Sequence, residues 1–301
     1  MAIHTLEPTR FFNLLGLREP PALVLRPGDS VRTWTLDAHG FDQHEKQVGE
    51  RPNPLTGPFH VEGAEPGDAL AIRLDGLQPN RSGCWSHRYL AENALEPSSV
   101  RRLPEQAYIR WNIDRKRRIV SPAEPPAGLE LPLKPMLGCI GTSPADGQVL
   151  STATAGTHGG NMDYPGIAEG ATIYLPVFVS GGELYLGDGH ATQGDGEIAG
   201  SGTEVSFDVR FTVNLLKGRR IGCPRGENAE WLFTLGNARP LEQALQQATS
   251  EMVRWLEQDY ALEPASIGLL LGQAVRYELA NVFDPAYTMV CKVPKWSLRR
   301  P

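Results

Sequence analysis

Carboxylates and an imidazole are closely spaced in one glycine-rich segment, residues 186–197. Asp188 and His190 are two residues apart, and Asp195 and Glu197 repeat that spacing. In extended backbone, residues two apart point to the same side, so each pair presents its polar groups together. Four glycines separate these residues and leave space for a small ligand beside them. The segment therefore combines groups that can transfer protons with groups that can bind a metal ion.

A second segment of the same kind lies upstream, at residues 157–163. It contains His158, Asn161 and Asp163 around a pair of glycines. Both segments belong to a stretch of 75 residues, 135–209, that has nine acidic residues and no lysine or arginine. The rest of the chain has 29 basic and 26 acidic residues, so the whole negative excess is local. Carboxylates clustered without cationic side chains repel one another unless a metal ion or shared protons neutralise them.

This acidic cluster has two interpretations. The acids either are dispersed over solvated loop tips or converge on a divalent metal ion. The spacing favours convergence, because the histidine stands within an Asp-x-His-x4-Asp-x-Glu pattern rather than alone on a strand. A set of carboxylates and imidazoles suits a divalent ion, and zinc is the expected one, with manganese or calcium as alternatives.

Sequence patterns of several other enzyme classes are absent. There is no Gly-x-Ser-x-Gly elbow, no Walker loop, and no dinucleotide fingerprint after a strand. Cys139 lies in Leu-Gly-Cys-Ile-Gly, without the context of a catalytic thiol, and is expected to be a small buried core residue.

The overall composition limits the partners and the location. A net charge of −6 argues against nucleic-acid binding. No apolar run reaches the ~18 residues of a membrane-spanning helix, and the N-terminus lacks the layout of a signal peptide, so no membrane partner is expected. The four cysteines are far apart and form no CxxC pair, which is typical of reduced thiols in a cytoplasmic protein.

Turn residues between short alternating runs predict a β-rich chain over most of its length. Strands are expected at residues 69–74, 107–113 and 204–216. Residues 172–179 and 183–186 are separated by Ser-Gly-Gly, and this pattern predicts a hairpin between them.

The period becomes helical near the C-terminus. An apolar stripe predicts a helix over residues 240–256, a second helix is expected over 263–280, and alternation predicts a final strand over 288–293. The expected fold class is mainly β, with an α+β C-terminal portion. A mainly-β catalytic body would cover residues 1–235, and residues 236–301 would pack on it.

Several motifs resemble those of the acetamidase/formamidase family. They run over most of the chain, and together they are highly specific, whereas any one alone would be weak. They are Asn-Pro-Leu-Thr-Gly-Pro-Phe-His-Val-Glu-Gly-Ala-Glu-Pro-Gly-Asp (53–68), Lys-Pro-Met-Leu-Gly-Cys-Ile-Gly (134–141), His-Gly-Gly-Asn-Met-Asp (158–163), Leu-Pro-Val-Phe-Val (175–179), Gly-Asp-Gly-His-Ala-Thr-Gln-Gly-Asp-Gly-Glu (187–197), Asn-Val-Phe-Asp-Pro (281–285) and Val-Pro-Lys (293–295).

The resemblance implies a sandwich-type body and the hydrolysis of short aliphatic amides to a carboxylic acid and ammonia. It also implies a homo-oligomer and a divalent metal ion. An early acidic position of the family is kept at Asp37. Metal ligands are accordingly expected at Asp37, Asp163 and His190, with Asp188 nearby.

The remaining candidates would carry out the proton transfers and bind the substrate. Glu197 or Asp195 would be the general base and then the general acid, because clustering with other carboxylates raises the pKa of one of them. His158 and Asn161 would form hydrogen bonds to the amide or to the oxyanion.

Two alternatives stay open at this point. The same cluster would suit a metal-binding β-sandwich protein that holds a structural ion with a closed ligand shell. The substrate would alternatively be a larger or cyclic amide, because one methylene changes discrimination by only ~1–3 kcal/mol. Residues 76–107 match no motif of the family, and loops of that kind can shape a substrate pocket. Residues 37–46 keep the acidic position Asp37 but are otherwise rich in His and Glu in a way that the family's motifs do not explain.

Overall fold

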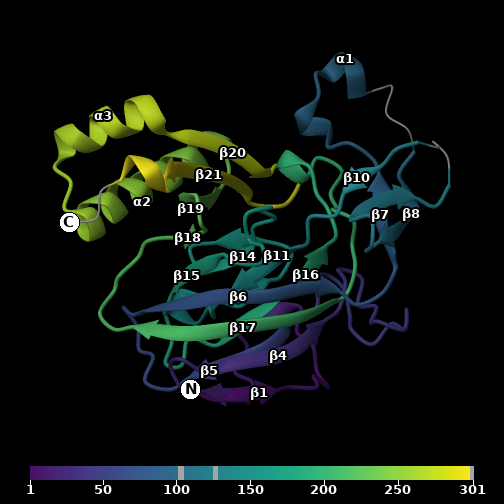
Figure 1. Cartoon of the computed structure of the whole chain (residues 1–301), viewed down its shortest axis with the longest axis horizontal. Helices are drawn as coiled ribbons and strands as arrows, with labels where there is room; N and C mark the ends of the chain where they lie inside the picture. The colour runs from purple at the N-terminus through teal and green to yellow at the C-terminus, as the bar shows by residue number, and fades with distance from the viewer. Residues whose placement is uncertain (101–104, 125–127, 299–301) are drawn as a thin grey trace.

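A nine-stranded sheet extends through most of the computed structural model, which describes residues 1–100, 105–124 and 128–298 (Figure 1). Its strands lie in the order β1 (Ile3–Thr5), β4 (Ser30–Thr35), β17 (Phe207–Leu216), β6 (Ala69–Pro79), β15 (Thr172–Pro176), β18 (Arg225–Glu227), β19 (Trp231–Ala238), β21 (Tyr287–Pro294) and β20 (Arg276–Asn281).

A six-stranded sheet packs against it. Its order is β13 (Ala155–Gly156), β14 (Gly159–Asn161), β11 (Met136–Gly141), β16 (Leu184–His190), β5 (Thr56–Val61) and β3 (Leu23–Leu25). Two smaller sheets complete the β-structure. The first consists of β10 (Leu131–Pro132), β9 (Ile119–Pro122), β8 (Ala107–Asp114) and β7 (Gly83–Arg88). The second consists of β12 (Leu150–Ser151) and β2 (Leu14–Leu15).

Helices are few, and the two long ones are close to the C-terminus. The α-helices are α1 (Pro97–Val100), α2 (Leu241–Tyr260) and α3 (Pro264–Ala274). Short 3-10 turns occur at η1 (Glu92–Ala94), η2 (Ala145–Gly147), η3 (Asp195–Glu197) and η4 (Lys295–Ser297). Within the described ranges, none of the helices is long and apolar enough to cross a membrane.

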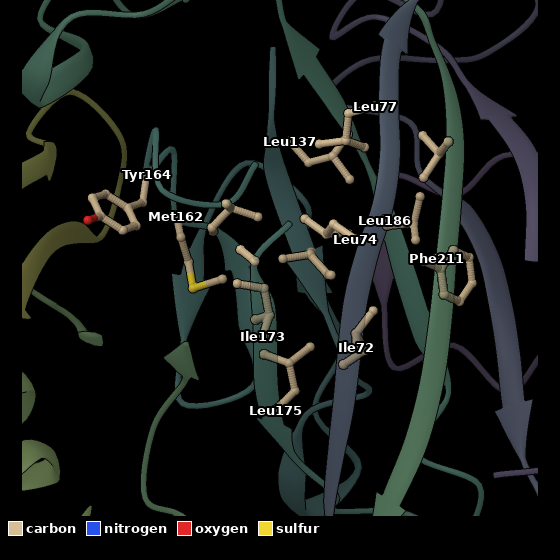
Figure 2. Packing of buried hydrophobic residues seen from close by; sticks show 14 of the residues in the cluster. Ile72, Leu74, Leu77, Leu137, Met162, Tyr164, Ile173, Leu175, Leu186 and Phe211 are labelled. Carbon is tan, nitrogen blue, oxygen red and sulfur yellow. The ribbon is translucent and has the colours of Figure 1, made fainter. Parts of the chain in front are cut away.

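The main hydrophobic core lies between the two large sheets. Strand β17 shows how the sequence builds it, because buried Phe207, Val209 and Phe211 alternate with exposed Asp208 and Arg210. Figure 2 shows side chains of both sheets meeting in this core, among them Ile72, Leu74, Ile173, Leu175, Leu137 and Leu186. The expected mainly-β, sandwich-type fold is confirmed.

The C-terminal portion continues the large sheet. The expected boundary at residue 235 lies inside β19, which pairs with β18 on one side and with β21 on the other. Helix α2 covers these strands, with Ala248 and Met252 packed against Leu232 and Val293. We propose that the body (1–235) and the α+β portion (236–301) form one folding unit.

Two expectations about local structure were wrong. The predicted hairpin does not form, because β15 pairs with β6 and β18 whereas β16 pairs with β11 and β5 in the other sheet. The intervening Gly181 and Gly182 have left-handed backbone (φ 81° and 71°) and carry the chain from one layer to the other.

The second predicted helix ends at Ala274 rather than Ala280. Val275 is extended, and the following residues form β20 against β21. The predicted strands at 69–74 and 107–113 are confirmed within β6 and β8. The predicted strand at 204–216 begins at Phe207 instead of residue 204. The predicted helix from residue 240 and the predicted final strand are also present, as α2 and β21.

Candidate active site

Strand β11 brings the two glycine-rich segments side by side. It pairs with β14 on one edge and with β16 on the other, so Asn161 and Gly187 lie opposite the same residue of β11. Asp163 lies two residues after the end of β14, and Asp188 and His190 lie at the end of β16. Side chains that are about 25 residues apart in the sequence therefore meet at the same end of this sheet.

A glycine of β11 makes room for these carboxylates. A Cβ atom at Gly138 would lie 2.4 Å from Asp163 Oδ1 and 2.6 Å from Asp188 Oδ2. Atoms at that separation overlap, so any larger residue would displace both acids. The two carboxylate groups thus occupy the space beside Gly138 that a side chain would otherwise fill.

Three of the acids stand on left-handed backbone. Asp163, Asp188 and Glu197 have φ values of 46°, 57° and 45°. Such conformations cost residues other than glycine about 1–3 kcal/mol each and persist only where the surroundings hold them. Strained backbone at three neighbouring carboxylates is typical of a functional site rather than of solvated turns.

The buried side chain of Asn281 is the centre of the acidic group. Its Nδ2 lies 2.7 Å from Asp163 Oδ2, 2.7 Å from Glu197 Oε2 and 2.7 Å from Asp284 Oδ2. An amide nitrogen has only two hydrogens, so it cannot donate to all three oxygens at once. Three carboxylate oxygens therefore converge on one amide nitrogen, which cannot donate a hydrogen bond to all of them.

Two sets of side chains have the composition of a metal site. Asp188, His190 and Glu204 form one set, and Asp163, His190 and Glu197 form the other. Within each set the possible ligand atoms lie within 4.8 Å of one another, and all five residues are buried. His190 belongs to both sets, so it is the centre of any ion-binding arrangement here.

A hydrogen bond orients the ring of His190. Its Nδ1 lies 2.8 Å from Gln193 Oε1, and its Nε2 lies 2.9 Å from Glu204 Oε1 and 3.5 Å from Asp188 Oδ1. Gln193 in turn donates to the Asp163 carbonyl at 2.6 Å. A ring nitrogen held by an outer partner while the other faces carboxylates is the arrangement usual for a metal-ligating histidine.

Burial and mutual repulsion raise the pKa values of the acids. Burial raises the pKa of Glu204 from 4.5 to about 7, against the opposing charge of His190, and raises that of Asp284 from 3.8 to about 6. Burial, with the charges of neighbouring acids, raises the pKa of Asp163 and of Glu197 well above its ordinary value. In the absence of a cation, the protonated forms of these groups are therefore more stable than those of free carboxyl groups.

The structure brings together most of the residues that the sequence singled out. Asp163, Asp188, His190 and Glu197 lie in the cluster itself. Asn161 lies beside it, with its Nδ2 donating to Asp284 at 2.6 Å and its Oδ1 accepting from Asn53 at 2.8 Å.

Three other candidates do not join the cluster. Asp37 accepts hydrogen bonds from Trp85 and Arg81, and it belongs to neither candidate metal set. Asp195 is exposed on the surface of η3. His158 is buried, which lowers its pKa to about 4, and its Nε2 has no hydrogen-bond partner in the described part of the chain.

Glu204, Asn281 and Asp284 are site residues that sequence reasoning missed. Glu204 was one of the nine local acids, but nothing in its spacing sets it apart. Asn281 and Asp284 lie in the motif Asn-Val-Phe-Asp-Pro, whose resemblance to the family was a usable signal. No local pattern reveals them, because they reach the cluster from almost 120 residues away.

A pocket of about 190 Å³ gives access to the acids. Asp188, Glu197, Glu204 and Asp284 line its acidic side, together with Asn161. The other lining residues are Ala38, His39, Arg51, Pro52, Asn53, Trp85, His87, Ala153, Gly200 and Ser201. The pocket is therefore small and of a size that suits a small molecule.

Known proteins are similar to this chain both in sequence and in fold. The model of the acetamidase/formamidase family matches residues 20–153 and 146–294. A formamidase from Methylophilus methylotrophus is 25% identical over 252 residues, which cover 66% of this chain and 62% of that protein. The chain spans less than two thirds of the length of the curated relatives it matches.

Solved structures cover the chain almost completely. An acetamidase from Yersinia enterocolitica has a TM-score of 0.86 at 30% identity, covering 99% of this chain and 93% of that one. An acetamidase from Bacillus halodurans has a TM-score of 0.82 at 30% identity, covering 97% and 98%. The motifs, the sandwich fold and the family match agree, and the chain belongs to the acetamidase/formamidase family.

Proposed function

We propose that this protein hydrolyses short amides, acetamide and formamide among them, to a carboxylate and ammonia. The observation that carries the proposal is the convergence of buried carboxylates on His190 and Asn281 at the end of a small pocket. Amide hydrolysis needs an activated water, stabilisation of the developing oxyanion, and a proton for the leaving nitrogen. The cluster contains groups for each requirement.

A divalent ion fits the residues that are present. Asp163 Oδ1, Asp188 Oδ1 and Glu204 Oε2 are buried and have no hydrogen-bond partner within the described ranges. Such oxygens are costly unless a cation or a proton satisfies them. We propose that Asp188, His190 and Glu204 hold the ion, with Asp163 beside them, and that the ion is zinc.

When bound, the ion would stabilise negative charge on the amide oxygen and lower the pKa of a water molecule. Asp163 and Glu197 share the N–H groups of Asn281 and form the second ligand set with His190. We assign the ion to the set of Asp188, His190 and Glu204. Among the described residues, the unpaired oxygens of Asp188 and Glu204 have no hydrogen-bond donor comparable to the Asn281 amide.

Glu197 is our candidate for the general base. It lines the pocket, it is only 6% exposed, and its Oε2 accepts from Asn281. Glu197 would take a proton from the water that attacks the carbonyl carbon and return it to the nitrogen as the carbon–nitrogen bond breaks. Burial raises the pKa of Glu197 above the ordinary value of a carboxyl group, which favours a group that first accepts a proton and then returns it.

Asn161 is our candidate for holding the substrate. Its Nδ2 donates one hydrogen to Asp284, and its second hydrogen is available to the substrate oxygen in the pocket. Asp284 accepts from both Asn161 and Asn281 and so fixes their amide groups. Exposed Asp195 and distant Asp37 have no part in this scheme.

The test is ammonia release from formamide, acetamide, propionamide and a lactam by protein loaded with zinc, manganese or calcium, and by protein treated with chelator. We expect turnover that the chelator abolishes and zinc restores. Stoichiometric ion binding without turnover of any amide would instead identify a structural ion site. Turnover of the lactam alone would identify a cyclic-amide hydrolase.

We also propose that the protein is a cytoplasmic homo-oligomer. All four cysteines are free and buried, and burial raises the pKa of the Cys139 thiol, which suits a reducing compartment. Leu269 of α3 and Trp296 of η4 are 73% and 84% exposed, and large apolar side chains of this kind are common at subunit contacts. Light scattering after size-exclusion chromatography measures the oligomeric state.

A further inference from the structure

Three side chains with aromatic rings line the same pocket as the acids and form a contiguous group, which we call the wall. The wall consists of His39, Trp85 and His87. The rings of His39 and Trp85 are stacked, with centroids 3.8 Å apart and planes 23° apart. His87 follows at 5.6 Å from Trp85, and Tyr108 packs against all three rings from outside the pocket.

Two strands and one loop build this wall. Trp85 and His87 are two residues apart on β7 and so point to the same side, and Tyr108 lies opposite His87 on β8. His39 comes from the loop after β4. His39 lies in the segment 37–46, and Trp85 and His87 lie in the segment 76–107, both within the residues that the family model matches.

Asp37 anchors the wall. Its Oδ2 accepts from Trp85 Nε1 at 3.0 Å and from Arg81, and its Oδ1 accepts from the His39 backbone N–H at 3.0 Å. The side chain of Asp37 is fully buried. This carboxylate, expected from the sequence to bind a metal ion, holds two elements of the wall together instead.

The wall is also fixed relative to the acids. The backbone N–H of Trp85 donates to the backbone carbonyl of Glu204 at 3.2 Å, and the backbone N–H of Glu204 donates to the backbone carbonyl of Trp85 at 2.7 Å. The backbone N–H of His87 donates to Ser201 Oγ at 2.8 Å. Because Glu204 belongs to a candidate metal set, these backbone hydrogen bonds connect the wall directly to that set.

The wall has the character of a binding surface for an uncharged ring. Burial lowers the pKa of His39 to about 4, and burial also lowers that of His87, so both imidazoles are neutral at pH 7. The pocket of about 190 Å³ is far larger than the ~10–15 Å³ that one water molecule needs. Formamide has no carbon substituent to contact the wall, and acetamide has only a methyl group.

We propose that the wall of His39, Trp85 and His87 binds a planar acyl group, so that aromatic carboxamides such as benzamide are better substrates than acetamide. This inference rests on the proposed amide hydrolysis and specifies its substrate class. The reaction adds water to benzamide, forms a carbon–oxygen bond, breaks the carbon–nitrogen bond, and gives benzoate and ammonia. The carboxamide would face the acids while the ring packs on the wall.

Steady-state ammonia release tests the preference with zinc-loaded protein and three amides. Benzamide supplies a flat ring, cyclohexanecarboxamide supplies a similar volume without a flat face, and acetamide supplies neither. We expect kcat/KM to be highest for benzamide. A kcat/KM for cyclohexanecarboxamide or acetamide that equals or exceeds the benzamide value would overturn the inference.

Trp85→Leu tests the wall directly. The ratio of kcat/KM for benzamide to that for acetamide should fall by about two- to twelvefold, which is the range for one aromatic contact. Trp85→Phe keeps a ring and should retain the preference, and His39→Leu, in the other segment, should reduce it. Trp296→Leu is the matched control, because that tryptophan is 84% exposed on η4.

Calorimetric titration of benzamide separates this inference from the proposed function. A protein that turns over no amide refutes the proposed hydrolysis. Benzamide binding that is weakened by Trp85→Leu and by His39→Leu, but not by Trp296→Leu, would still support the wall. Equal ratios in all variants, or no benzamide binding to the folded wild-type protein, would refute it.

Discussion

The substitution Gly138→Ala probes the cluster without removing any of its polar groups. The added Cβ would lie 2.4 Å from Asp163 Oδ1 and 2.6 Å from Asp188 Oδ2, whereas ordinary contact begins near 3.4 Å. Both carboxylates would have to move by about 1 Å. Displacements of that size at a reacting centre lower rates by about 100-fold, and disturbed ligand support weakens metal binding by about 10–100-fold.

The fold should survive this change. Gly138 lies in the middle of β11, its φ is not in the left-handed region, and alanine is compatible with extended backbone. Gly194→Ala is the matched control, because nothing lies within 4 Å of its added Cβ and its φ is −86°. The control introduces the same methyl group close to η3 but outside the cluster.

The assay combines zinc affinity by competition with a chelating dye, kcat/KM for acetamide, and thermal unfolding by circular dichroism. We expect Gly138→Ala to lose affinity and rate by about the factors given, and Gly194→Ala to stay within about twofold of wild type. If Gly138→Ala binds zinc and turns over amide like the wild type, the two carboxylates do not act in the positions described. The reasoning about the cluster would then be refuted.

Three further perturbations follow from the same geometry. Glu197→Gln should lower amide turnover by about 10²–10⁴-fold in the ammonia assay, while the zinc content stays constant. Asp195 is exposed, so Asp195→Asn should change turnover by less than twofold. The reverse pattern would assign the general base to Asp195 instead of Glu197. Asn281→Asp removes the donor shared by three acids and should lower the free energy of unfolding of metal-free protein by about 3 kcal/mol or more in urea, and an unchanged value would contradict that shared role. In metal-free protein the raised pKa values of Asp163, Glu197 and Glu204 mean that the folded state binds more protons than the unfolded chain, so the free energy of unfolding, and the melting temperature with it, should fall between pH 7 and 8.5. The slope is at most about 1.4 kcal/mol per pH unit for a group that stays protonated, and about half of that at pH 7 for Glu204, whose pKa is raised to about 7. Saturating zinc should reverse that trend, and a melting temperature that rises with pH in the absence of metal would contradict the assignment.

Several features could be predicted because they depend on neighbours in the sequence. Alternation in residues 207–213 of β17 predicted which side chains are buried, since the two faces of a strand are set by its own pleat. The local excess of acids without lysine or arginine indicated the site. Asp163, Asp188, His190 and Glu197 were found in this way.

Strand pairing could not be predicted from the same information. The Ser-Gly-Gly between β15 and β16 has the composition of a hairpin turn, but the two strands enter different sheets. Alternation shows that a strand has a buried face and does not show which strand lies beside it. The helix expected over 263–280 was too long for a related reason, because Arg276–Asn281 becomes a strand through its pairing with β21.

The sequence by itself indicated the cluster of acids, the mainly-β character and the family. Only the tertiary structure decided that Glu204, Asn281 and Asp284 complete the cluster, and that Asp37 anchors Trp85 instead of joining it. Asn281 and Asp163 are 118 residues apart, and Asp37 and Trp85 are 48 apart. Convergence over such separations depends on how the sheets pack and on which buried polar groups must find partners, and no local spacing encodes that.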